Sequence, residues 1–103
     1  MQTARRIFHR KRHYDDGSIS ELTLWLVPAP VRGSQHLFRY RLFFGRPGEI
    51  FVLYDNEPGK GDHRHYGNRE ERYQFTTAEQ LISDFLANVR SVRRRMVSDE
   101  GDG

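Results

Sequence analysis

The stretch LFRYRLFF, residues 37–44, alternates apolar and basic side chains and decides the fold of the chain. In an extended strand every second residue points to the same face, and here that face receives Phe38, Tyr40, Leu42 and Phe44. Arg39 and Arg41 fall on the opposite face. The pattern predicts a strand in a sheet that buries one face and leaves the other accessible.

Strands of similar character are predicted on both sides of this stretch. Residues 5–14 and 18–27 flank the turn Asp15-Asp16-Gly17, a strong hairpin signal because Asp-Gly tolerates positive φ. After a turn at 45–48, a fourth strand is expected over 49–55, and Arg72–Phe75 could form a short fifth one. We expect Trp25 to lie in the core.

One amphipathic helix is predicted at the C-terminal end of the chain. Thr76 is the expected N-cap, with Glu79 three residues later as its capping-box partner. Apolar residues from Ala78 to Met96 recur at three- and four-residue steps, so this stripe should lie on the sheet. The predicted fold class is α+β: an antiparallel four- to five-stranded β-meander followed by one C-terminal amphipathic helix. Residues 1–98 form the expected single domain, and 99–103 a flexible acidic tail.

Composition excludes several classes of protein. The chain has 103 residues with seven Phe, five Tyr and one Trp, which suits one small folded domain rather than a disordered polymer. There is no cysteine, so disulfide scaffolds, zinc ribbons and thiol catalysis are excluded. We find neither a signal peptide nor an apolar stretch long enough for a membrane span, and expect a cytoplasmic protein.

Basic residues gather near both ends of the chain. Such segments attract phosphate backbones or acidic protein surfaces, although they can also be merely solvated faces. The predicted nucleic-acid-binding residues are Arg5, Arg6, Arg10, Lys11, Arg12 and Arg69. A second group near the end of the helix combines cations with apolar side chains, as protein interfaces and homodimers do. The predicted partner-binding residues are Arg90, Val92, Arg93, Arg94 and Met96.

The polar, glycine-containing stretch over residues 56–71 is predicted as a long loop, and such loops are often functional. His36, by contrast, is expected at the surface. One interpretation of the loop is metal-independent cleavage of RNA, with His63 and His65 as acid and base because imidazole titrates near neutrality. Cations would offset the charge of the phosphorane, and an aromatic ring could stack on a base. The predicted catalytic residues are Lys60, Asp62, His63, Arg64, His65 and Tyr66.

Two other interpretations of this loop stay open. Carboxylates together with imidazoles fit manganese, zinc or magnesium, although a His-x-His pair alone is weak evidence. The alternative metal ligands are Asp55, Glu57, Asp62, His63 and His65; otherwise no cofactor is expected. The histidines could also be structural, within a hairpin or Ω-loop that turns at Pro58-Gly59 and Gly61-Asp62.

Three strings together resemble a small prokaryotic family, the TumE-like toxins of toxin–antitoxin pairs: YRLFFGRPG at 40–48, YDNE at 54–57 and GKGDHRH at 59–65. The resemblance extends from about Gly17 to Val92. It implies a cytoplasmic protein encoded beside a helix-turn-helix antitoxin that neutralises it. RNA as the target is our inference from the side chains. The alternative is a non-enzymatic toxin or regulator that binds nucleic acid or the antitoxin.

Overall fold

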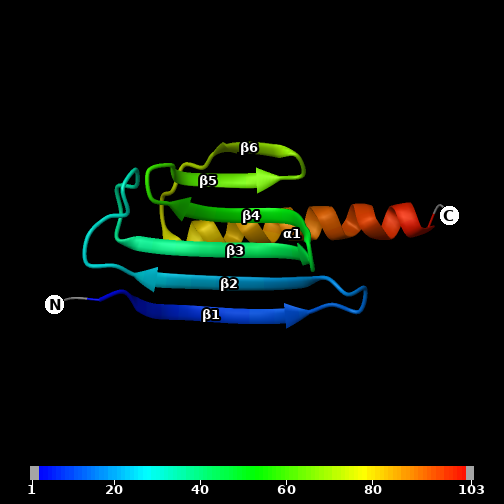
Figure 1. Ribbon diagram of the computed structural model, residues 1–103. Coiled ribbons are helices and arrows are strands. Elements are labelled where there is room, and N and C mark those ends of the chain that lie inside the picture. Colours follow the sequence, from blue (N-terminus) through cyan, green and yellow to red (C-terminus); the bar gives the residue numbers. More distant parts are fainter. Residues whose placement is uncertain (1–2, 102–103) are drawn as a thin grey trace.

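The chain forms one antiparallel sheet followed by one helix, which confirms the predicted α+β class (Figure 1). The computed structural model describes residues 3–101. The six strands pair in chain order, so the sheet has more strands than the four or five expected. The strands are β1 (Arg5–His13), β2 (Ile19–Leu26), β3 (Phe38–Arg46), β4 (Glu49–Glu57), β5 (Gly61–Tyr66) and β6 (Arg69–Arg72), and the helix is α1 (Ala78–Gly101).

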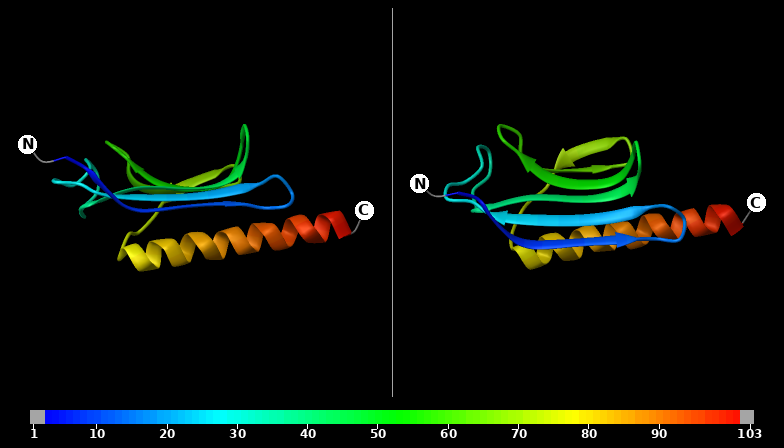
Figure 2. Two further views of the ribbon diagram at one scale, coloured as in Figure 1. Left: turned by 90° about the horizontal axis from the view of Figure 1, so that it is seen from below. Right: turned by 60° about the horizontal axis from the view of Figure 1, so that its bottom comes forward.

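Helix α1 covers one face of the sheet and packs on β3 and β4, while the other face stays open (Figure 2). The core lies between the two layers and follows the predicted alternation of the strands and the stripe of the helix. Burial of these apolar side chains is the main favourable term for such a fold. Its fully buried members, each at most 3% exposed, are Leu22, Leu24, Tyr40, Leu42, Phe44, Val52, Tyr54, Leu81, Phe85 and Val89.

The stretch predicted as a long polar loop instead contains the end of β4, a turn and the β5–β6 hairpin, so the loop prediction was wrong. The alternative of a hairpin is confirmed for the turn at Pro58-Gly59 but not for Gly61-Asp62, which begins β5. Lys60 N–H donates to the Glu57 carbonyl at 3.1 Å across the Pro58-Gly59 turn, where Gly59 has φ +91°. Gly67, at φ +62°, turns the chain again into β6. The polar composition concealed these strands because an edge hairpin leaves many of its side chains in water. The short strand expected at Arg72–Phe75 was misplaced: β6 spans Arg69–Arg72, and residues 73–75 lie outside any strand.

Two smaller predictions were also wrong. Trp25 is half-buried on the face away from α1, because along β2 it alternates with the leucines of the other face, of which Leu22 and Leu24 are in the core. The N-cap of α1 is Thr77 rather than Thr76: the Gln80 backbone N–H donates to Thr77 Oγ1 at 3.0 Å.

Helix α1 continues through Gly101, so residues 99–101 of the expected tail are helical, and residues 102 and 103 lie outside the described part. Within the described residues, no helix is long and apolar enough to cross a membrane.

The cap of α1 can be tested with two adjacent threonines. We expect Thr77→Ala to lower the free energy of unfolding by about 1 kcal/mol, because the Gln80 N–H loses its acceptor. Thr76→Ala should change it by less than about 0.5 kcal/mol, as is usual for surface substitutions. Urea denaturation followed by circular dichroism measures both. Equal losses in the two variants would contradict the assigned cap.

Candidate functional site

Strand β5 divides the predicted catalytic residues between the two faces of the sheet. His63 and His65 lie on the open face, as their spacing predicted, because they pair with Asp55 and Leu53 of β4. The intervening Asp62, Arg64 and Tyr66 pair with residues of the face that α1 covers. The predicted set therefore does not form a single site.

His63 and Asp55 form the buried centre of the open face. The His63 Nε2 atom is 2.7 Å from Asp55 Oδ1, and their side chains are 6% and 10% exposed. On the other side of the ring, His63 Nδ1–H donates to the Gly61 carbonyl at 2.9 Å. This bond fixes the tautomer, so that a neutral His63 presents the Nε2 lone pair to the carboxylate.

The Nε2 lone pair of His63 and the carboxylate of Asp55 repel each other at 2.7 Å. A proton or a metal cation must therefore lie between them or beside them. Asp55 Oδ1 is buried and receives no hydrogen bond from any residue in the described part of the chain. Burial raises the pKa of Asp55, although the His63 ring opposes this shift. The pair can hold a shared proton, or it can supply two ligands to a cation.

Glu70 and His65 complete the cluster. Glu70 Oε1 is 3.8 Å from His63 Nε2 and 3.7 Å from His65 Nε2. The ligand atoms of the two histidines and Glu70 all lie within 4.8 Å of one another. His65 and Glu70 are half-exposed or exposed, so the cluster opens to solvent above the buried His63. We call Asp55, His63, His65 and Glu70 the β4–β6 cluster.

The donor set of the β4–β6 cluster suits a divalent cation. Two imidazoles and two carboxylates are ligands for manganese or zinc, and a ligating histidine typically donates its other N–H to a carbonyl, as His63 does. The Lys60 ammonium, 3.3 Å from Glu70 Oε1, lowers the pKa of that carboxyl. Glu70 is therefore ionised over the whole neutral range.

The sequence analysis did not identify Glu70 as a site residue. It is brought beside His65 by the pairing of β5 with β6, whose register depends on the turn at Gly67-Asn68. Gly-Asn between two strands is a recognised hairpin signal. Had that dipeptide been taken as a turn, counting back from it would have placed residue 70 opposite residue 65.

The other two predicted metal ligands do not belong to the group whose ligand atoms converge, although Glu57 lines the same hollow as Asp55. Glu57 is exposed at the end of β4. Asp62, on the opposite face of β5, accepts hydrogen bonds from Tyr40 and His36. His36 is therefore not the surface residue that was expected: its side chain is 14% exposed.

Arg64, Tyr66 and Arg69 lie on the side of the β5–β6 hairpin that faces α1. Arg64 Nε donates to Glu71 Oε1 at 2.6 Å, and its Nη1 donates to the Tyr54 hydroxyl at 3.0 Å. Tyr66 accepts a hydrogen bond from Arg95 of α1. These contacts are structural, and none of the three side chains reaches the histidines.

The two basic segments meet on one surface. Strand β1 is exposed along its whole length and forms the sheet edge opposite β6. The groove between β1 and α1 has a volume of about 220 Å³ and an apolar floor. Its cationic wall consists of Arg10, Arg12, Arg90 and Arg93.

The remaining predicted binding residues are distributed differently. Arg6 and Lys11 pair with residues of the open face, whereas Arg5 pairs with Leu26. Arg94 is exposed on α1, outside the groove. Val92 and Met96 are half-buried against the core, which limits the area that they offer to a partner.

Comparisons with known proteins agree with the resemblance noted in the sequence. The family model described as toxin TumE matches residues 2–94, nearly the whole chain. No curated protein and no solved structure matches the chain.

The buried Asp55 carboxyl predicts a pH-dependent stability. Because its pKa is raised in the folded protein, the folded state holds this proton more tightly than the unfolded chain does, so stability falls as pH rises through that pKa. Asp55→Asn should therefore stabilise the cation-free protein more at pH 8 than at pH 5. Each unit of pKa difference is worth about 1.4 kcal/mol.

Urea denaturation in chelator at the two pH values measures this difference, and Glu49→Gln, at an exposed acid at the start of the same strand, is the control. A stability gain that is independent of pH, or that is larger at pH 5, would contradict the assignment.

Proposed function

Since the chain belongs to the toxin TumE family, we propose that it is a toxin that cleaves RNA at a divalent cation held by the β4–β6 cluster. The observation that carries this proposal is the convergence of His63, His65 and Glu70 within 4.8 Å, with Asp55 2.7 Å from His63. Two strand registers create this convergence, because Asp55 faces His63 and His65 faces Glu70.

The four side chains proposed to bind the cation differ in orientation and exposure. The Gly61 carbonyl holds the His63 ring with Nε2 toward the cluster, and the buried Asp55 Oδ1 has no other partner among the described residues. His65 and Glu70 lie at the solvent side, where substrate can approach. A bound cation would polarise the scissile phosphodiester and stabilise the charge that develops on its oxygens.

The same geometry disfavours the metal-independent mechanism in which His63 and His65 are acid and base. Both ring nitrogens of His63 are engaged, one by the Gly61 carbonyl and one against Asp55, and the side chain is 6% exposed. A general acid or base must come within hydrogen-bonding distance of the substrate. His65 alone, at 33% side-chain exposure, meets that condition.

An RNA strand could follow the open face away from the cluster. The next residues on this face are Arg41, the register partner of Asp55, and Arg39, the partner of Trp25. Trp25 and the two arginines border a hollow of about 170 Å³ that also contains Asp55. Arginines for phosphates and a ring for base stacking are what single-stranded RNA requires. Lys11 and Arg6 of β1 would extend this path.

A toxin of this family requires an antitoxin, and the groove between β1 and α1 is a suitable surface for one. Its apolar floor and four arginines suit an acidic amphipathic segment, since arginine forms bidentate hydrogen bonds with carboxylates. We expect the helix-turn-helix antitoxin to supply that segment. A second copy of the chain is the other occupant that this surface allows.

The cleavage proposal predicts a dependence on both the cation and the cluster. Purified protein should degrade a labelled RNA in the presence of Mn²⁺, and excess chelator should abolish the activity. His65→Ala or Glu70→Gln should lower the rate by roughly 10²-fold or more, as loss of a ligand or catalytic group typically does. Glu71→Gln, which alters the neighbouring carboxylate on the other face of the hairpin, should retain the activity.

Cleavage that persists in chelator and in Glu70→Gln would favour metal-independent chemistry instead. RNA that is bound but left intact under every condition would favour the non-enzymatic alternative.

A further inference from the structure

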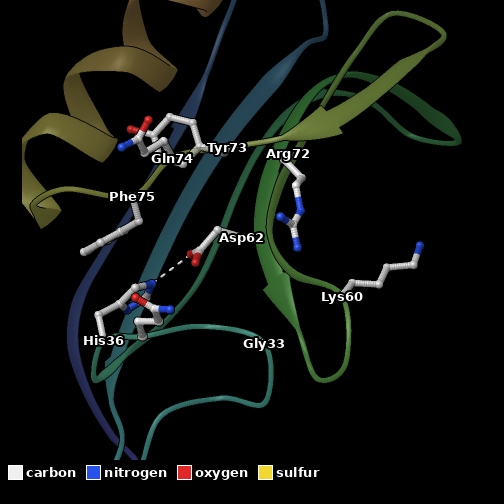
Figure 3. Close-up of a pocket in the computed structure, with 9 residues that line it drawn as sticks. Gly33, His36, Lys60, Asp62, Arg72, Tyr73, Gln74 and Phe75 are labelled. Atoms are coloured by element: carbon white, nitrogen blue, oxygen red, sulfur yellow. Dashed lines mark hydrogen bonds and ion pairs between the residues drawn. The ribbon is translucent and has the colours of Figure 1, made fainter.

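A further cavity, of about 560 Å³, opens beside the start of β5 (Figure 3). It lies among the loop before β3, the beginning of β5 and the segment that leads from β6 to α1. The side chains that define its chemistry are His36, Lys60, Asp62, Arg72, Gln74 and Phe75. The β4–β6 cluster uses none of these residues as a ligand.

Asp62 is the fixed polar group of this cavity. Its Oδ1 accepts hydrogen bonds from the Tyr40 hydroxyl at 2.7 Å and from His36 Nε2 at 2.8 Å. The Phe38 backbone N–H donates to His36 Nδ1 at 3.1 Å, so the proton of the neutral ring must be on Nε2. These contacts hold a carboxylate that is only 13% exposed.

The second oxygen of Asp62 is left for a ligand. Within the described part of the chain no group donates to Oδ2, and this atom is not enclosed by protein. Figure 3 shows the Asp62 side chain projecting into the space between His36 and Arg72. An ionised carboxylate only accepts hydrogen bonds, so the matching part of the ligand must be a donor.

An aromatic stack and a close backbone contact form part of the cavity wall. The His36 ring stacks on Phe75, with 3.7 Å between centroids and 22° between planes. The loop before β3 touches β5 so closely that a Cβ on Gly33 would be 2.8 Å from Gly61 N. A planar ring could pack against the outer surface of this aromatic pair.

Two basic side chains, Lys60 and Arg72, belong to the lining of this cavity and also lie beside residues of the β4–β6 cluster. Lys60 Nζ is 3.3 Å from Glu70 Oε1, and Arg72 is the register partner of His63. Both residues line the cavity and are exposed, and in Figure 3 the Lys60 side chain extends away from Asp62. A ligand whose ring enters the cavity would therefore have its phosphate beside these cations and near the cluster.

We propose that this cavity binds a guanine nucleotide of the RNA substrate, next to the phosphate that is cleaved. Guanine presents an imino N1–H and an amino N2–H side by side, whereas the other three bases offer fewer donors on that edge. Asp62 Oδ2 would accept from both donors of this edge, and the Gln74 amide could donate to O6. Lys60 and Arg72 would contact the phosphate. This inference rests on the proposed RNA substrate and adds the identity of the base.

Binding of the four nucleoside 3′-monophosphates to the full chain in chelator tests the proposal by isothermal titration calorimetry. Guanosine 3′-monophosphate should bind about 10-fold or more tightly than the other three, as expected for a paired hydrogen-bond contact. Asp62→Asn keeps the shape but turns a donor toward the base, so it should abolish this preference. Lys60→Ala should lower the affinity for all four nucleotides to the same extent, and Glu57→Gln should leave the four affinities unchanged.

Equal affinities of the four nucleotides for the wild-type protein would overturn the proposal, even if Asp62→Asn fails to fold. A guanine preference that survives in a folded Asp62→Asn variant would overturn it as well. The mononucleotides contain no phosphodiester and the assay contains no cation, so the result does not depend on cleavage. Guanine-selective binding without RNA cleavage would support the base preference of the cavity while refuting the proposed function.

Discussion

The register between β4 and β5 is the constraint on which the rest of the site depends. A shift of one residue would turn His63 and His65 under α1 and bring Asp62 and Arg64 to the open face. Two features hold this end of the sheet in place. The buried Asn56 side chain accepts from Tyr40 N–H at 2.9 Å and donates to the Phe38 carbonyl at 2.7 Å. Gly61 lies against Gly33, where a side chain at either position would collide with backbone.

The β4–β6 cluster lowers the stability of the folded protein. A carboxyl whose Oδ1 lacks a hydrogen bond and whose pKa is raised by burial lowers stability at neutral pH. An apolar pair at positions 55 and 63 would satisfy the packing of the sheet without that cost. Perturbed, imperfectly satisfied groups of this kind concentrate at functional sites. This energetic argument supports a functional role for the cluster independently of the family match.

Local sequence patterns predicted the fold, whereas the site depends on contacts between residues that lie far apart in the sequence. Alternation over 37–44, the Asp-Gly turn and the apolar stripe of the helix each depend on neighbours in the sequence, and all three were confirmed. Glu70 was missed because its position depends on a hairpin whose polar strands lack alternation. Trp25 was misassigned because a single aromatic residue carries no signal for which face is covered. His36 acquires its burial from Phe75 and Asp62, 39 and 26 residues later in the sequence.

The distance between the groove and the cluster constrains how an antitoxin could inhibit cleavage. The groove lies at the β1 edge, and β5 is four strands away, roughly 19 Å at about 4.8 Å per strand. An extended chain spans at most about 3.3–3.6 Å per residue, so at least about six residues are needed to cross the sheet. The segment must also pass around the β1 edge, because the groove faces α1 and the cluster faces away from it. For an antitoxin that docks in the groove, a short helix alone would therefore leave the cluster accessible, and direct inhibition from there would need an extended arm across the open face.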